Sequence, residues 1–265
     1  MHIVRFLDDE NQVCYGTQVE EHSAIRLHGD IFDGLTETGE RVRVNKWLAP
    51  VDPPAILCIG INYKAHADET GIKLPEYPVL FMKNPASVIG HKEAVVLPES
   101  CRNPLQVDYE LELAVIIGKP AKNVPIDSAL DYVAGYTVAN DVSARIWQAN
   151  AGAGQWIRGK SFDTFCPMGP ALVTPDEIPD PDRLNLTCVL NGRVMQESST
   201  SDMIFSTPRL IAYLSEDTTL LPGTVILTGT PSGVGFTRNP PVFLTPGDRI
   251  EMTIEKLGML VNTVA

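Results

Sequence analysis

Residues 107–119 constrain the fold strongly, because two carboxylates alternate there with apolar side chains in what the pattern predicts to be one β-strand. The sequence VDYELELAVIIGK is rich in β-branched and aromatic residues, and Gly118 followed by Pro120 ends it. Successive side chains of a strand point to opposite faces. One face is therefore purely apolar and consists of Tyr109, Leu111, Leu113, Val115 and Ile117.

The opposite face carries Glu110 and Glu112, which a strand places about 7 Å apart along the backbone. Burying two unpaired carboxylates is costly, and like charges so close raise the pKa of one of them. Three explanations remain open: a solvated edge, a pair of lysine or arginine side chains, or a divalent cation ligated by oxygen atoms. A cation needs at least one further carboxylate from elsewhere in the chain.

Composition excludes several classes of function. The net charge of −12 and the isoelectric point of about 4.8 argue against a nucleic-acid partner, since phosphates require a basic surface. The five cysteines are scattered without C-x-x-C spacing, which favours a reducing compartment. The chain has neither a signal-peptide hydrophobic region nor an apolar run of the ~20 residues that a membrane span needs. We therefore expect a soluble cytoplasmic or mitochondrial-matrix protein, not a secreted one.

Prolines divide the chain into two parts. Residues 1–50 read as a small β-rich module in which we find no chemistry. Pro50, Pro53 and Pro54 then stiffen the backbone and exclude regular structure. We expect a boundary here, with a larger domain over residues 54–265.

A histidine and a glutamate follow the first apolar strand of this larger domain. His66 and Glu69 are three residues apart, so a short helix places them on one face. A carboxylate beside an imidazole fixes its tautomer and raises its basicity, as a general base requires. The alternative is a surface histidine beside a helix-stabilising glutamate. Residues 72–78 follow a glycine and contain two prolines, which is typical of a lid.

Asp141 is a candidate for the third carboxylate, because it stands where a strand predicted over residues 133–139 ends. Its alternative role is to cap a helix predicted over residues 142–150, and the two roles are compatible. That helix places Arg145 and Gln148 on one face.

Two glycine-containing segments also attract attention. Gly159-Lys160-Ser161 resembles the end of a phosphate-binding loop, but the required upstream glycine is Gln155, so we reject nucleotide binding. The glycine-rich turn over residues 228–235 exposes backbone N–H groups that could hold an anion, or it is only a tight connection.

Five motifs in order resemble the fumarylacetoacetate hydrolase family. They are N-Y-x-x-H-x-x-E at 62–69, Y-E-x-E at 109–112, N-D-V-S-A-R at 140–145, G-K-S-F-D-T-F at 159–165 and L-T-G-T-P-S-G-V-G at 227–235. The variant is similar to fumarylacetoacetate-hydrolase-domain proteins of the oxaloacetate tautomerase and acylpyruvase kind. The resemblance implies an α+β, mostly β fold, in which a mixed β-roll or β-sandwich catalytic domain follows the small β-rich module. It also implies a homodimer.

The resemblance further implies a set of site residues. Glu110, Glu112 and Asp141 would hold Mg²⁺ or Mn²⁺, in agreement with the strand argument. The implied catalytic residues are His66, Glu69 and Lys160. The implied substrate-binding residues are Tyr63, Arg145, Gln148, Gly229 and Thr230.

The implied activity is that of a Mg²⁺-dependent enzyme acting on small 2-oxo (1,3-dicarbonyl) acids through a metal-stabilised enolate. We favour keto–enol tautomerisation of oxaloacetate, with His66 moving a proton to or from C3. C–C bond hydrolysis of an acylpyruvate or a fumarylacetoacetate-type substrate, and oxaloacetate decarboxylation, are alternatives that share the enolate. The alternative from another class is a non-catalytic metal-dependent binding protein.

Overall fold

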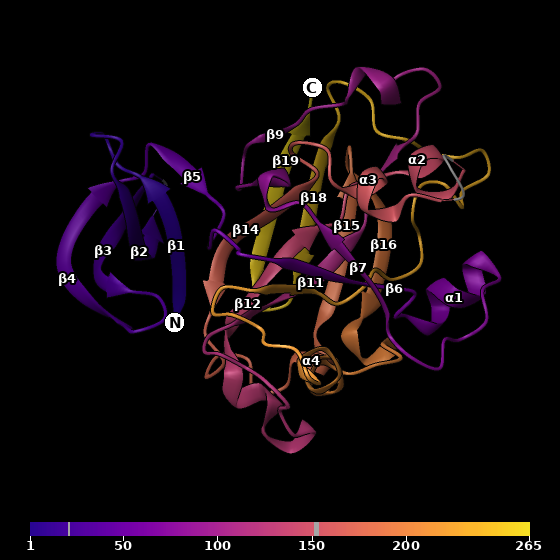
Figure 1. Cartoon of the computed structure of the whole chain (residues 1–265). Coiled ribbons are helices and arrows are strands. Elements are labelled where there is room, and N and C mark those ends of the chain that lie inside the picture. Colours follow the sequence, from indigo (N-terminus) through magenta and orange to yellow (C-terminus); the bar gives the residue numbers. More distant parts are fainter. Residues whose placement is uncertain (21, 151–153) are drawn as a thin grey trace.

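The computed structural model describes residues 1–20, 22–150 and 154–265. The N-terminal part of the chain forms antiparallel strands. β1 pairs with β2 and β5, β2 pairs with β3, and β3 pairs with β4. These strands are β1 (His2–Leu7), β2 (Val13–Glu20), β3 (Ser23–Asp30), β4 (Gly34–Arg43) and β5 (Lys46–Leu48). They lie at one side of the molecule, as Figure 1 shows in indigo and violet.

β1 joins this opening to the rest of the chain. Its residues Val4 to Leu7 pair with β2, whereas His2 and Ile3 pair with Val173 and Leu172 of β14 (Cys166–Val173). One sheet therefore runs through both parts of the described chain, in the order β4-β3-β2-β1-β14-β12-β11-β17-β6-β7. The predicted division of the chain at residues 50–54 stays a prediction.

The second part of this sheet contains β11, the strand from which the sequence argument started, and its neighbours. They are β6 (Ile56–Gly60), β7 (Val79–Lys83), β8 (Val88–Ile89), β11 (Leu111–Ile117), β12 (Val133–Asn140) and β17 (Val225–Leu227). β11 lies between β12 and β17, antiparallel to both. β17 and β6 run parallel, so residues that follow these two strands emerge at the same edge of the sheet.

A second sheet packs against the first one. Its order is β16 (Arg193–Ser199), β15 (Asn185–Leu190), β18 (Arg249–Ile254), β19 (Gly258–Val264) and β9 (Ala94–Val95). The turn between β15 and β16 has positive φ at Asn191 (50°) and Gly192 (78°), as a type I′ hairpin requires.

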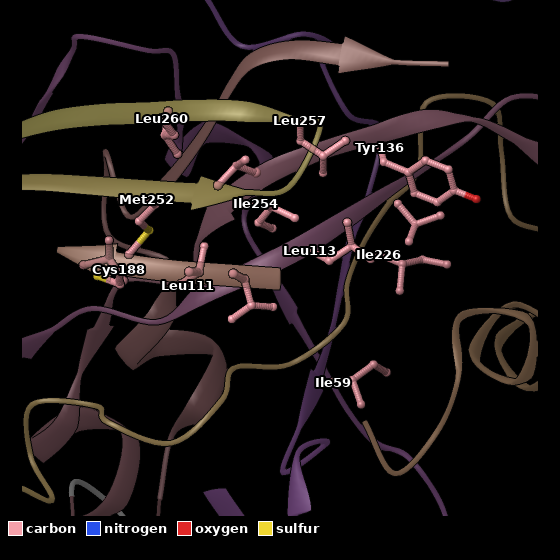
Figure 2. Packing of buried hydrophobic residues seen from close by; sticks show 14 of the residues in the cluster. Ile59, Leu111, Leu113, Tyr136, Cys188, Ile226, Met252, Ile254, Leu257 and Leu260 are labelled. Carbon is pink, nitrogen blue, oxygen red and sulfur yellow. The ribbon is translucent and has the colours of Figure 1, made fainter. Parts of the chain in front are cut away.

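The main core lies between the two sheets. Figure 2 shows Leu111 and Leu113 of β11 facing Met252 and Ile254 of β18. All five residues of the predicted apolar face belong to this core, whereas Ala114 and Ile116 belong to a separate cluster on the other face of β11. The predicted alternation along this strand is confirmed.

Two predictions about the ends of elements were wrong. The strand predicted over 107–119 is interrupted, because β10 (Val107–Asp108) pairs with β13 (Ser143–Ala144) and β11 begins only at Leu111. The Asn140 side chain accepts the Glu110 N–H (3.0 Å), and the Asp108 carboxylate accepts the N–H of the next residue, so these N–H groups leave the ladder.

The helix predicted over residues 142–150 is also shorter than expected. It is α2 (Arg145–Ala149), whose cap position is Ala144 with no capping side chain. Asp141 does not cap this helix, because its carboxylate is bonded to two lysine side chains that the next subsection describes.

The remaining helices are short. α1 (Lys64–Thr70), α2 and α3 (Trp156–Lys160) lie on the side of the molecule away from the N-terminal strands (Figure 1). α4 (Thr207–Ser215) buries Leu210, Ile211 and Leu214, which lie on one face of the helix. The 3₁₀ turns span Pro85–Ser87, Glu99–Cys101, Ile126–Tyr132, Pro181–Arg183 and Thr200–Asp202. No helix among the described residues is both long and apolar enough to cross a membrane.

Leu113→Ala should lower the free energy of unfolding by about 2–5 kcal/mol, because the fully buried side chain would leave a cavity between the sheets. Urea denaturation measures this loss. The matched control is Leu221→Ala at a side chain that is 53% exposed, for which we expect little change. Equal losses for both variants would contradict the assignment of the core.

Candidate active site

Three buried carboxylates gather where β11 begins and β12 ends. Glu110 and Asp141 lie just outside these strands, and Glu112 lies within β11. One oxygen atom from each of the three carboxylates lies within 4.8 Å of the others. Because Glu110 is 6%, Glu112 1% and Asp141 0% exposed, the explanation by a solvated edge is wrong.

Two cations account for the charge of Glu110. Lys160 Nζ donates to Glu110 Oε2 (2.8 Å), Asp141 Oδ2 (2.5 Å) and Ser143 Oγ (2.7 Å). Arg145 Nη1 donates to Glu110 Oε1 (2.6 Å), and its Nε donates to Asp108 Oδ2 (2.9 Å). Burial alone would raise the pKa of Glu110, but Lys160 and Arg145 outweigh it and hold that pKa well below its usual range.

Lys83 is a site residue that sequence reasoning missed. Its side chain is fully buried, and Nζ donates to Asp141 Oδ1 (2.5 Å) and to the Val142 carbonyl (3.1 Å). A usable signal was present, since alternation along β7 places Lys83 on the same face as the inward-pointing Phe81. A lysine at a core position requires a buried anion beside it.

Glu112 is the exception in this network. Its Oε2 accepts the Gly229 N–H (2.7 Å), and no lysine or arginine among the described residues forms an ion pair with it. Burial, Asp141 and Glu110 all raise the pKa of Glu112 well above its usual value. At this site the described chain therefore sets four buried carboxylates (Asp108, Glu110, Glu112, Asp141) against three cations, of which Lys83 and Lys160 are buried and Arg145 is largely buried.

This excess of negative charge fits a divalent cation. Three converging carboxylates offer the oxygen atoms that hard cations prefer, and Glu112 forms no ion pair with any of the residues described. The carboxylate set is therefore chemically suited to a metal ion of the Mg²⁺ or Mn²⁺ type.

His66 and Glu69 form the pair that their spacing predicts. On α1, His66 Nδ1 lies 3.1 Å from Glu69 Oε2. Glu69 Oε1 accepts the Gly233 N–H (2.9 Å) and the Thr237 hydroxyl (2.8 Å). Burial tends to raise the pKa of Glu69, but the hydrogen bonds from His66, Thr237 and Gly233 together lower it. His66 is 5% exposed, so it is not a surface histidine.

A cavity of about 280 Å³ brings most of the predicted residues together. Its polar lining consists of His66, Thr70, Glu110, Glu112, Arg145, Gln148, Lys160 and Thr230. The rest is apolar or glycine and comprises Ile59, Gly60, Ile61, Ile72, Phe81, Ala149, Trp156 and Phe236. The two kinds of lining make the cavity suited to a small molecule with a charged part and an apolar part.

Four predicted residues do not line this cavity. Glu69 and Asp141 act on its lining through His66 and Lys160, as described above. Gly229 bonds to Glu112, and a side chain at its position (φ +99°) would meet Asn62 Cβ at 2.7 Å. Tyr63 is fully buried in the core, and its hydroxyl has no hydrogen-bond partner in the part of the chain described. Its role in substrate binding stays a prediction.

Comparison with protein families assigns both parts of the chain. Residues 55–265 match the model described as fumarylacetoacetate (FAA) hydrolase C-terminal. The chain belongs to the fumarylacetoacetate hydrolase family. Residues 1–50 match a second model, described as Rv2993c-like, N-terminal. The predicted family is thereby confirmed.

Several relatives are similar over most of the chain. Rat and human oxaloacetate tautomerases (Fahd2a and FAHD2A, mitochondrial) are each 48% identical over 219 residues, which cover 82% of this chain and 69% of the relative. The structure of 5-carboxymethyl-2-hydroxymuconate delta-isomerase from Mycobacterium smegmatis is 36% identical with a TM-score of 0.86. Fumarylacetoacetate hydrolase from Exiguobacterium antarcticum is 34% identical with a TM-score of 0.83.

These solved structures cover all of this chain and 99% of their own. The expected α+β, mostly β fold of the family, with a small β-rich opening, is confirmed. The protein is an enzyme of the fumarylacetoacetate hydrolase family, which disfavours the non-catalytic alternative.

Glu110→Gln should destabilise the metal-free protein by about 3–5 kcal/mol, because it leaves Lys160 and Arg145 with less counter-charge. Glu112→Gln should leave stability unchanged or raise it, because it removes a carboxylate without an ion-pair partner among the described residues. Urea unfolding in EDTA compares this matched pair. A loss for Glu112→Gln as large as that for Glu110→Gln would contradict the charge imbalance.

Proposed function

We propose that this enzyme is a divalent-metal-dependent oxaloacetate keto–enol tautomerase. The observation that carries the proposal is one cavity lined both by His66, which is paired with Glu69, and by Glu110 and Glu112 of the carboxylate cluster. The names of the rat and human relatives support the choice of oxaloacetate.

In this proposal, Glu110, Glu112 and Asp141 hold Mg²⁺ or Mn²⁺. When bound, the metal supplies a Lewis acid that polarises the 2-oxo group of the substrate. The protein contributes a buried setting in which two of the three carboxylates are already oriented by Lys83, Arg145 and Lys160. The ligands therefore need little rearrangement.

His66 is the proposed general base. When its Nδ1–H donates to Glu69, Nε2 is left unprotonated and can accept a proton from C3 of the keto form. The C3–H electron pair forms the C2=C3 double bond, the carbonyl π electrons move to the 2-oxo oxygen, and that oxygen takes the proton, which gives the enol. In the reverse direction His66 delivers the proton to C3.

Lys160 and Gln148 are the proposed stabilisers of the negative charge that develops on the substrate oxygen. Burial tends to lower the pKa of Lys160, but Asp141 and Glu110 outweigh it and raise that pKa above its usual value. Lys160 therefore stays positively charged throughout the neutral range. Arg145 donates to the Gln148 side-chain oxygen (2.9 Å), which orients the amide. The amide N–H₂ of Gln148 forms no hydrogen bond within the described residues and is the group proposed to face the substrate.

The apolar wall of the cavity favours a second candidate, C–C hydrolysis of an acylpyruvate. Phe81 and Trp156 pack edge to face with ring centroids 5.4 Å apart, and both line the cavity. Such an apolar wall suits an acyl group better than it suits the second carboxylate of oxaloacetate. The same histidine would then activate water against the second carbonyl.

We also propose that residues 1–50 and 54–265 are separate domains.

We propose as well that the enzyme forms a homodimer. The exposed side chains of Leu80 (48%) and Met82 (40%) lie on β7, at an end of the large sheet, and support an interface with a second copy of the chain there. Light scattering during gel filtration measures the mass, and a monomer at micromolar concentration would contradict the dimer.

Proton NMR of oxaloacetate tests the reaction. Purified enzyme with Mg²⁺ should accelerate enol–keto exchange, and EDTA should abolish the acceleration. Formation of pyruvate at a matching rate would identify a decarboxylase. If oxaloacetate is unaffected while an acylpyruvate is cleaved, the hydrolase is the correct reaction.

His66→Ala should lower kcat by about 10²–10⁴-fold, because general acid–base catalysis contributes that much. The stabilisation of the protein by Mg²⁺, measured as a shift in Tm, should persist because His66 is not among the converging carboxylates. His28→Ala, at an exposed residue of β3, is the matched control with normal kcat expected. Unchanged turnover for His66→Ala would exclude it as the base.

A further inference from the structure

The Glu69 carboxylate is held on two sides by different parts of the chain. Its Oε2 faces His66 on the same helix, at 3.1 Å. Its Oε1 faces the loop after β17, where it accepts the Thr237 hydroxyl (2.8 Å) and the Gly233 N–H (2.9 Å). The two oxygen atoms therefore have different partners, and the orientation of the carboxylate is defined.

The loop is itself anchored apart from α1. Asp108 Oδ1 accepts the Gly235 N–H (2.8 Å), and its Oδ2 accepts the Phe236 N–H (3.0 Å). Arg238 donates to the Gly233 carbonyl (3.1 Å). Thr237 is consequently a fixed point onto which Glu69 docks, rather than a side chain that follows the helix.

We propose that Thr237 is a positioning residue for the His66–Glu69 pair. Its hydroxyl holds Glu69 Oε1 toward the loop, so that Oε2 is presented to His66 Nδ1 and keeps the proton on that nitrogen. This inference rests on the proposed function, in which Nε2 of His66 is the general base.

The single hydrogen of the Thr237 hydroxyl has two acceptors in reach. They are Glu69 Oε1 at 2.8 Å and the Val234 carbonyl at 2.9 Å. The carboxylate is ionic and the carbonyl is neutral, and hydrogen bonds to ionised acceptors are roughly twice as strong. The hydroxyl therefore donates to Glu69.

Gly233 supplies the second bond but cannot be tested by substitution. Its φ is +101°, and a Cβ atom at this position would meet the Met195 carbonyl oxygen at 2.1 Å. Any side chain would therefore displace the backbone. Thr237 is partly exposed, so its substitution leaves the core untouched.

Loss of the hydroxyl has a defined effect on ionisation. The groups that act on the Glu69 carboxylate are His66 from its own helix and Gly233 and Thr237 from the loop. Arg238 of the same loop is bonded to backbone carbonyls instead. Without Thr237 one bond that lowers the pKa of Glu69 is lost, so the Glu69 carboxylate binds a proton more readily. The acid limb of the pH–rate profile reports the hydrogen-bonded His66–Glu69 pair as a unit, so it moves to higher pH.

The test compares Thr237→Val, which keeps the shape, with Thr237→Ser, which keeps the hydroxyl. We expect Thr237→Val to lower kcat for oxaloacetate about tenfold with KM little changed, since a hydrogen bond to a charged group is lost. Its acid limb should move to higher pH, and Thr237→Ser should restore both. Thr38→Val, remote on β4, is the matched control.

A double-mutant cycle shows whether Thr237 acts through Glu69. Adding Thr237→Val to Glu69→Gln should cost no further activity, because the group that Thr237 positions has already changed. Independent, multiplying losses would overturn the proposal, as would a Thr237→Val enzyme with normal kcat and an unshifted acid limb.

A readout that needs no turnover separates this inference from the proposed function. The ¹⁵N NMR shifts of the His66 ring, assigned with His66→Ala, report which nitrogen carries the proton. Thr237→Val should move the ring from the Nδ1–H form toward a mixture of tautomers. An unchanged tautomer would overturn the proposal. If no 2-oxo acid is turned over but the tautomer shifts, the proposed function fails and the positioning role stands.

Discussion

The structure depends on a buried network in which the Lys160 ammonium binds Glu110, Asp141 and Ser143 together. Glu110 lies just before β11, Asp141 just after the neighbouring β12, and Ser143 in β13. A single side chain therefore holds these strand ends together. Isolated buried charges are strongly unfavourable, and only mutual pairing makes them tolerable. Lys83 and Arg145 extend the pairing to β7 and α2.

The network is incomplete within the described chain, and that incompleteness distinguishes a reactive centre from a structural ion cluster. A structural cluster would balance its charges, whereas among the described residues the Glu112 carboxylate accepts a hydrogen bond only from the Gly229 N–H. The folded chain therefore leaves unbalanced negative charge in this centre, and that charge attracts an added cation.

Local patterns were enough to predict the elements around the site, since alternation along residues 111–117 identified both faces of β11 and the spacing of His66 and Glu69 identified their pairing. Residues that act across long distances in the sequence were missed. Lys83 offered only its inward position on β7, Thr237 carries no local motif, and their partners Asp141 and Glu69 lie 58 and 168 positions away. The late start of β11, at Leu111, was missed for a similar reason, because the side chain of Asn140 accepts the Glu110 N–H in place of a neighbouring strand.

The division of β1 between two neighbours has a mechanical consequence. Its first residues lie against the edge of β14, whereas the following ones belong to the N-terminal strands. The opening segment therefore cannot rotate as a body on a hinge without shearing a continuous strand. The opening segment also covers the edge of β14. Without β1, that edge would present free N–H and C=O groups, which are a template for unwanted pairing with other chains.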